Sequence, residues 1–113
     1  MIRIPATVYV ASAPIDLRLS FDRLAGIVRD VLGREPRAEA AFVFHNRART
    51  HAKILWHDGI GLSLYAKRLD RGKFIWPSAS GGAISISAAQ MAYMLEGIDW
   101  RNPQLTWRPE SAG

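Results

Sequence analysis

The sequence has no cysteine among its 113 residues, which excludes disulfides, thiol catalysis and cysteine-ligated zinc. It also has no apolar run approaching the ~18 residues that a membrane span needs, so we expect no membrane partner. The apolar stretch after Arg3 is short and is interrupted by Pro5, which argues against a signal peptide. These absences favour a cytoplasmic protein.

Acidic side chains are also scarce: 10 Asp and Glu stand against 15 Lys and Arg, which gives a formal net charge of +5. A polyanion, with nucleic acid ahead of other candidates, is the default partner of such a chain. Twelve of the 15 basic residues are arginine, the side chain better suited to bidentate phosphate and base contacts.

The acidic residues and histidines give no pattern typical of an enzyme. No two aspartates show an evident phosphoryl-transfer role, and the field around residues 47–73 is positive, so we predict no catalysis. His45, His51 and His57 recur every six residues, and the first and third could face each other across a hairpin. No cysteine or carboxylate pattern completes a metal site around them. We therefore predict no metal and no cofactor.

The stretch from 41 to 77 predicts four short strands joined by three turns. Apolar residues alternate within each strand, so they can share one buried face of an antiparallel meander. The residues with this parity are Phe42, Phe44, Ile54, Trp56, Leu62, Leu64, Phe74 and Trp76. Residues 58–61 and 70–72 supply Asp and Gly for tight turns, Asn46 is the expected left-handed residue of the first turn, and Pro77 ends the last strand.

Basic charge gathers in the same window. It holds seven basic and two acidic side chains, so the whole formal excess of +5 belongs to it. One interpretation is a nucleic-acid surface, because these cations can converge on a phosphate backbone. The alternative is a solvated face that keeps the sheet soluble and blunts its edges. The candidate nucleic-acid-binding residues are Arg18, Arg47, Arg49, Lys53, Lys67, Arg68, Arg71 and Lys73. For Arg18, a local ion pair with Asp16 is an equally good interpretation.

Two helices and two further strands are expected outside the window. Ser20 is a candidate N-cap for an amphipathic helix that Gly33 closes, and residues 87–90 have the form of a capping box for a second helix that Gly97 ends. Residues 6–11 and 84–86 are β-rich. We therefore predict an α+β fold, an antiparallel meander of about four to six strands with two helices packed on one face.

The expected domain organisation is simple. Residues 1–100 are predicted to form a single domain, with the basic meander at 41–77. Residues 78–83 have the composition of a flexible loop, and residues 101–113 are predicted to be a C-terminal tail.

Three blocks of the meander resemble one known family. They are FVFHNR at 42–47, KILWHDGIG at 53–61 and KRLDRGKFIWP at 67–77, and PIDLR at 14–18 with LEGIDW at 95–100 extends the likeness over most of the chain. The family is the TnpB-type accessory protein of the IS-sixty-six class of bacterial insertion sequences, distinct from the RNA-guided nucleases that share the TnpB label. Departures are minor: Leu19-Ser20 replaces a Lys-Gly-like pair, Asp70 replaces Glu, and His51 stands where an acid or Arg is common.

The resemblance implies a small protein that is encoded beside a separate acidic-triad transposase and is required for efficient transposition. It supplies no catalytic residue that could be carried over. We therefore expect a non-enzymatic accessory protein that binds insertion-sequence DNA through the basic meander and assists the transposase. The alternative is an adaptor that docks the transposase or another accessory chain through the same surface. Neither interpretation fixes an oligomeric state.

Overall fold

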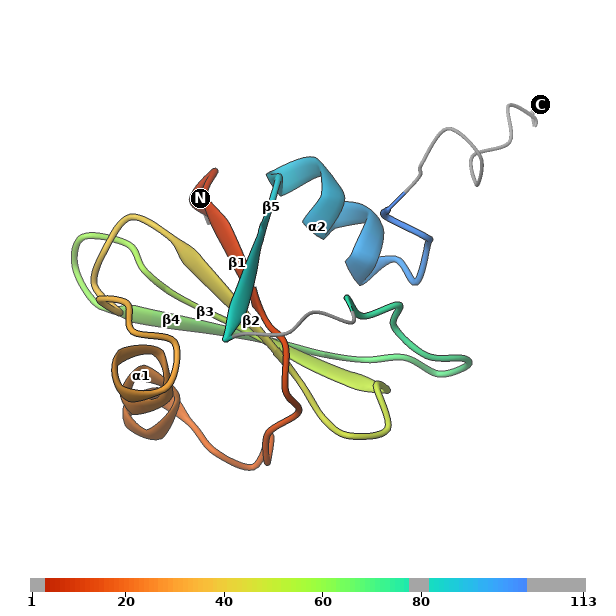
Figure 1. Ribbon diagram of the computed structural model, residues 1–113, viewed down its shortest axis with the longest axis horizontal. Helices are drawn as coiled ribbons and strands as arrows, with labels where there is room; N and C mark the ends of the chain where they lie inside the picture. Colours follow the sequence, from red (N-terminus) through yellow and green to blue (C-terminus); the bar gives the residue numbers. More distant parts are fainter. Residues whose placement is uncertain (1–3, 78–81, 102–113) are drawn as a thin grey trace.

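The computed structural model describes residues 4–77 and 82–101. In chain order the elements are β1 (Val8–Ala11), α1 (Phe21–Asp30), β2 (Ala41–His45), β3 (His51–His57), β4 (Leu62–Arg68), β5 (Ala83–Ile86) and α2 (Ala88–Leu95). The five strands form one sheet in the order β4-β3-β2-β1-β5. β1 runs parallel to β2, and the other neighbouring strands are antiparallel. The predicted α+β fold with a largely antiparallel sheet is confirmed (Figure 1).

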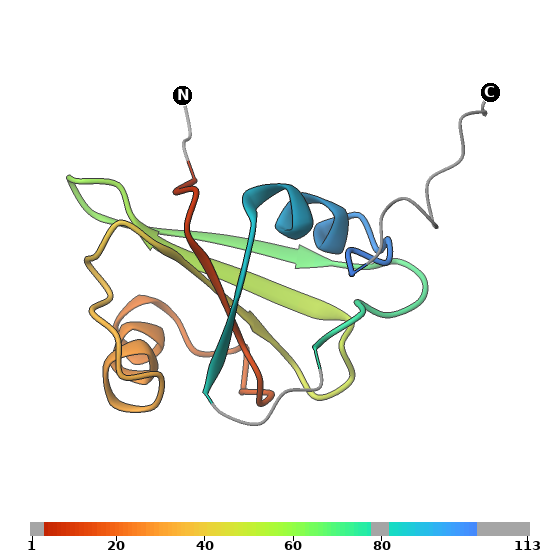
Figure 2. The same cartoon turned by 45° about the horizontal axis from the view of Figure 1, so that its top comes forward.

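The two helices cover opposite faces of the sheet (Figures 1 and 2). α1 packs Leu24 and Val28 against a cluster that includes Phe42 on one face. α2 packs Met91 and Met94 into a separate cluster on the other face. This arrangement corrects the expectation that both helices share a face. Because β2 is buried along its whole length, each of its faces needs a covering layer.

The register of the central hairpin corrects the predicted apolar face. Phe42 pairs with Leu55 and Val43 pairs with Ile54, so Ile54 lies on the α2 face while Phe42 lies on the α1 face. Residues that pair across neighbouring strands lie on the same face of the sheet. A register shift of one residue therefore moves every side chain of a strand to the opposite face. The predicted alternation holds within β2, β3 and β4, but these strands do not combine into one apolar face.

The fourth predicted strand of the meander is not a strand. Residues 73–77 are irregular, although Phe74 and Trp76 are both buried in the cluster on the α2 face. The Trp76 indole N–H donates to the Ala11 carbonyl at 2.6 Å, and the Trp100 indole N–H donates to the Ile75 carbonyl at 2.6 Å. Two buried tryptophans thus hold this segment against the body in place of a strand ladder.

The predicted helix boundaries are partly confirmed. The capping box at Ser87 and Gln90 is complete, with both reciprocal hydrogen bonds present. Ser20 occupies the N-cap of α1, but its side chain makes no capping hydrogen bond. Gly33 and Gly97 follow their helices with positive φ, as left-handed caps require.

Two further predictions, a flexible loop and a C-terminal tail, concern residues that lie largely outside the described part of the chain. Most of the predicted loop at 78–83 and the tail at 101–113 lie outside the described residues, apart from Gly82, Ala83 and Arg101. In the part of the chain that the structure covers, no helix has the length and hydropathy to cross a membrane.

Candidate nucleic-acid interface

Two loops that are distant in sequence lie side by side at one end of the sheet. They are the β2–β3 turn, residues 46–50, and the loop after β4, residues 69–73. The Leu69 N–H donates to the Thr50 carbonyl at 2.9 Å, and the Phe74 N–H donates to the Arg49 carbonyl at 2.7 Å. Figures 1 and 2 show both loops at the same end of the sheet. The backbone therefore brings the cations of both loops together.

Five of the eight candidate residues gather at this end, and all five are exposed. We call this set the basic end; it consists of Arg47, Arg49, Arg68, Arg71 and Lys73. Within residues 4–77 and 82–101, no carboxylate forms an ion pair with any of them. Asp70 is the acidic residue of the same loop. A group of exposed, unpaired cations at fixed positions can contact successive phosphates of a nucleic-acid backbone.

The two strand lysines lie on opposite faces of the sheet. Lys53 lies on the α1 face, where its Nζ donates to the Leu19 carbonyl at 2.9 Å. Lys67 lies on the α2 face, with its Nζ 3.7 Å from a carboxylate oxygen of Glu96. This separation follows from the register, in which Lys53 pairs with Ala66. The candidate residues were expected to converge on one phosphate backbone, but the structure turns these two lysines to opposite faces of the sheet.

Arg18 lies beside the same end of the sheet but is already paired. The Ile15 N–H donates to the His45 carbonyl at 2.9 Å, which ties this segment to the end of β2. The Arg18 guanidinium is 2.8 Å from the Asp16 carboxylate, and the predicted ion pair is present. Hydrogen bonds from Arg18 lower the pKa of Asp16 to about 2, so the carboxylate remains charged in ordinary buffers.

Asn46 organises the turn that carries Arg47 and Arg49. Its Oδ1 accepts hydrogen bonds from the backbone N–H groups of Thr50 and His51, both at 3.0 Å. Its Nδ2 donates to the Thr50 hydroxyl at 3.1 Å. Asn46 was expected to be left-handed, but Arg49 takes that conformation instead, with φ of 60°. Sequence reasoning missed the organising role, although the tendency of Asn to bond to nearby backbone is the signal that indicates it.

His45 is a buried residue that contacts both the β2–β3 turn and the core. It is 4% exposed, and its ring centroid lies 4.1 Å from that of Trp76. Its Nδ1 is 2.9 Å from the Asn46 carbonyl oxygen, and its Nε2 is 3.3 Å from that of Ser12. Two carbonyls favour a protonated ring, but the cost of burying its charge is larger, so the pKa of His45 is lowered.

The three histidines do not converge. His45 pairs with Ala52, whereas His57 lies at the far end of β3, so the two do not face each other across the hairpin. Over the described ranges, no three His, Asp or Glu side chains form a group that could hold a metal ion.

The chain matches the family model described as IS66 Orf2 like protein over residues 6–105. It belongs to this family. It is 51% identical over 106 residues to the uncharacterized protein y4hO of Sinorhizobium fredii (strain NBRC 101917 / NGR234), covering 94% of this chain and 92% of that protein. The uncharacterized protein y4jC of the same strain is 31% identical over 93 residues, covering 82% of this chain and 80% of that protein. No solved structure matches. The family associates the chain with transposition as an accessory protein.

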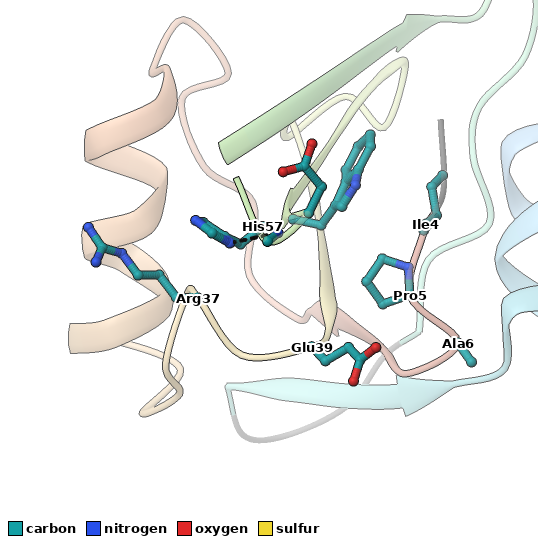
Figure 3. A pocket seen from close by; sticks show the side chains of 9 residues that line it. Ile4, Pro5, Ala6, Arg37, Glu39 and His57 are labelled. Carbon is teal, nitrogen blue, oxygen red and sulfur yellow. Dashed lines mark hydrogen bonds between the residues drawn. The ribbon is translucent and has the colours of Figure 1, made fainter. Parts of the chain in front are cut away.

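The opposite end of the sheet has a different character in this IS66 Orf2-like chain. A hollow of about 620 Å³ lies there beside the β3–β4 turn. Figure 3 shows Arg37, Glu39 and His57 around it. Asp58 also lines this hollow, so acidic and basic groups are mixed there. Mixed charge suits a polyanion less well than the basic end does.

Proposed function

We propose that this protein assists transposition by binding DNA without catalysis, and that the basic end is the contact surface. The observation that carries the proposal is a set of five exposed cations, four on two loops that backbone hydrogen bonds hold together and one, Arg68, at the end of β4, with no carboxylate partner among the described residues. Membership of a family associated with transposition supports this proposal.

The charge arrangement favours phosphate contact over simple solvation. Elsewhere on the described surface, Arg29 and Arg101 are each paired with a carboxylate, Asp30 and Asp99 respectively. The basic end instead leaves its guanidinium groups available for charge-assisted hydrogen bonds. If all five cations neutralise phosphates, log affinity falls with log salt at a slope of about −4.5.

The test is salt-titrated fluorescence anisotropy with a duplex from the insertion-sequence end and a scrambled duplex of equal length. The variant removes three charges from the basic end, Arg47→Ala, Arg68→Ala and Arg71→Ala. We expect it to weaken binding at least about tenfold at low salt and to make the salt slope shallower by about 2.7. Preference for the end duplex would add sequence recognition to this contact.

A matched control removes three exposed arginines elsewhere, Arg23→Ala, Arg29→Ala and Arg37→Ala. Both variants lose the same net charge, so the comparison tests where the charge lies; within the described residues, only Arg29 of the control set has an ion-pair contact, a weak one of 4.0 Å with Asp30. Equal loss of affinity in the two variants would show that overall charge, not the basic end, is responsible. No binding by the unaltered protein at low salt would refute the proposal and favour an adaptor that docks the transposase, which co-purification after nuclease treatment detects.

A further inference from the structure

A second hollow opens beside the basic end, on the α1 face of the sheet. Its volume is about 390 Å³. Side chains that line it include Leu17, His51, Lys53, Ala66 and Arg68. No residue of α1 lines it, because the first turn of α1 lies near residues 60–62 at the other end of the sheet. The volume is within the range of ordinary ligand sites, which is roughly 300–1,000 Å³.

Two cations on the wall are positioned for an anion. Lys53 is half-buried, and its Nζ donates one hydrogen bond to the Leu19 carbonyl at 2.9 Å. An ammonium group has three N–H donors, so two remain for a ligand. Arg68 is exposed and has no ion-pair partner in the described part of the chain. The hydrogen bond to Leu19 therefore fixes the position of the Lys53 ammonium group, and the Arg68 guanidinium is available to a ligand.

The hydrogen bonds around His51 determine which of its ring nitrogens carries the proton. Asn46 Oδ1 accepts two backbone N–H groups, which identifies the other amide atom as the donor Nδ2. That Nδ2 lies 3.2 Å from His51 Nδ1, and the Thr50 hydroxyl lies 2.9 Å from the same nitrogen. With two donors facing it, Nδ1 is an acceptor. The neutral ring therefore carries its hydrogen on Nε2, which is a third donor beside Lys53 and Arg68.

The remaining lining differs from that of a simple phosphate site. Leu17 and Ala66 provide an apolar floor against which a flat ring can pack. Asp70 also lines the hollow, and its carboxylate repels a free anion but accepts hydrogen bonds from the amino group of a base. Cations, an apolar floor and one acceptor together match a nucleotide better than they match inorganic phosphate.

We propose that this hollow holds one unpaired nucleotide of a DNA strand, an inference that rests on the proposed DNA binding. Its phosphate contacts Lys53, Arg68 and the His51 Nε2–H, and its base packs on Leu17 and Ala66. A base that is paired and stacked in a duplex cannot enter such a hollow, whereas an unpaired base can. The basic end then tracks the adjoining duplex, and the hollow selects DNA with a single-stranded extension.

The experiment compares two fluorescent duplexes that differ only in a short single-stranded extension, with the full chain and anisotropy as readout. We expect the extended duplex to bind roughly tenfold tighter, in line with the loss that removing one base contact causes elsewhere. Ala66→Met fills the floor of the hollow and is expected to reduce this preference to about twofold or less, since the base loses its site. Binding of the blunt duplex stays unchanged. Ala92→Met, at an exposed alanine of α2, is the matched control and keeps the preference.

The outcomes separate this inference from the proposed function. A blunt duplex that binds as well as the extended one overturns the nucleotide site and leaves DNA binding at the basic end intact. A preference for the extension that survives both Ala66→Met and Arg68→Gln also overturns it, because the unpaired strand is then held elsewhere. If neither duplex binds, the proposed function fails together with this inference.

Discussion

The turns at the two ends of the sheet are organised in the same way, but by side chains of different charge. At each end one side chain organises a tight turn: Asn46 in the β2–β3 turn and Asp58 in the β3–β4 turn. The Asp58 carboxylate accepts the backbone N–H groups of Ile60 and Gly61, both at 2.9 Å, and these bonds lower its pKa. The neutral Asn46 amide also accepts two backbone N–H groups, those of Thr50 and His51. A neutral organiser leaves Arg47 and Arg49 unpaired, whereas a carboxylate there would neutralise them.

The largest expected effects come from two single substitutions, Asn46→Ala and Asp58→Ala, each of which removes the side chain that organises its turn. Each substitution deletes two side-chain hydrogen bonds to backbone N–H groups, so each is expected to lower the free energy of unfolding, by about 1–3 kcal/mol for the partly buried Asn46. Chemical denaturation measures this loss. Only Asn46→Ala is expected to weaken DNA binding as well, because it alone loosens the turn that carries Arg47 and Arg49.

Asn46→Asp sharpens the same comparison. A carboxylate can still accept the N–H groups of Thr50 and His51, so we expect a smaller loss of stability than in Asn46→Ala. The added negative charge should nevertheless reduce DNA affinity. DNA affinity equal to that of the unaltered protein would show that the neutrality of the organiser does not matter.

The buried His45, beside the basic end, makes the stability of the fold sensitive to pH, and the opposite end has no buried histidine among the described residues. Burial lowers its folded-state pKa below the ordinary 6.5, so the unfolded chain takes up a proton first as the pH falls. Stability is therefore full above pH 6.5, decreases below it, and levels off beneath the folded-state pKa. Thermal unfolding from pH 7.5 to 5 checks this, with about pH 6.5 as the start of the fall. His45→Asn should flatten that part of the profile. An unchanged slope would assign the effect to another group.

Arg49 allows charge to be separated from backbone geometry. It holds a left-handed conformation, φ 60°, which costs a non-glycine residue of order 1 kcal/mol. Arg49→Gly should therefore leave stability unchanged or raise it slightly, while one phosphate contact is lost and the salt slope becomes shallower by about 0.9. Arg49→Ala removes the same charge but keeps the strain, so it is the control. Lower stability in Arg49→Gly than in Arg49→Ala would refute the interpretation of strain.

The elements of this fold are largely predictable because their signals are local. The capping box at Ser87 and Gln90, the glycine after each helix and the alternation within each strand all depend on residues a few positions apart. The assignment of faces depends instead on the register between strands. That register pairs Phe42 with Leu55 and not with Ile54, and nothing in either strand alone determines it. Phe74 and Trp76 alternate like a strand, but they are held by loop and indole hydrogen bonds.

The candidate site, like the fold, is predictable from the sequence only where it depends on residues close together in the chain. Arg47 and Arg49 share one turn, and Arg71 and Lys73 share one loop that directly follows Arg68 at the end of β4, so each of these two groups follows from sequence. Their meeting across the two loops requires the Leu69–Thr50 hydrogen bond, which is a tertiary contact. Lys53 and Lys67 separate because successive residues of a strand point to opposite faces. The hollow beside the basic end depends on Leu17, Ala66 and Asp70, which come from three segments and share no motif.

The smallest predicted effect concerns Arg18, which is adjacent to the basic end but bound to Asp16. Asp16→Asn removes one negative charge and releases the guanidinium, while the amide oxygen can still accept the Arg18 backbone N–H that Asp16 Oδ1 now accepts at 2.9 Å. We expect DNA affinity to rise about two- to threefold and the salt slope to become steeper by up to about 0.9, because a sixth cation joins the surface. Asp30→Asn, which releases Arg29 on α1 from a weak contact of 4.0 Å, removes the same charge far from the basic end and should change affinity less. If the two variants gain equally, the gain reflects net charge alone, and Arg18 does not belong to the DNA-binding surface.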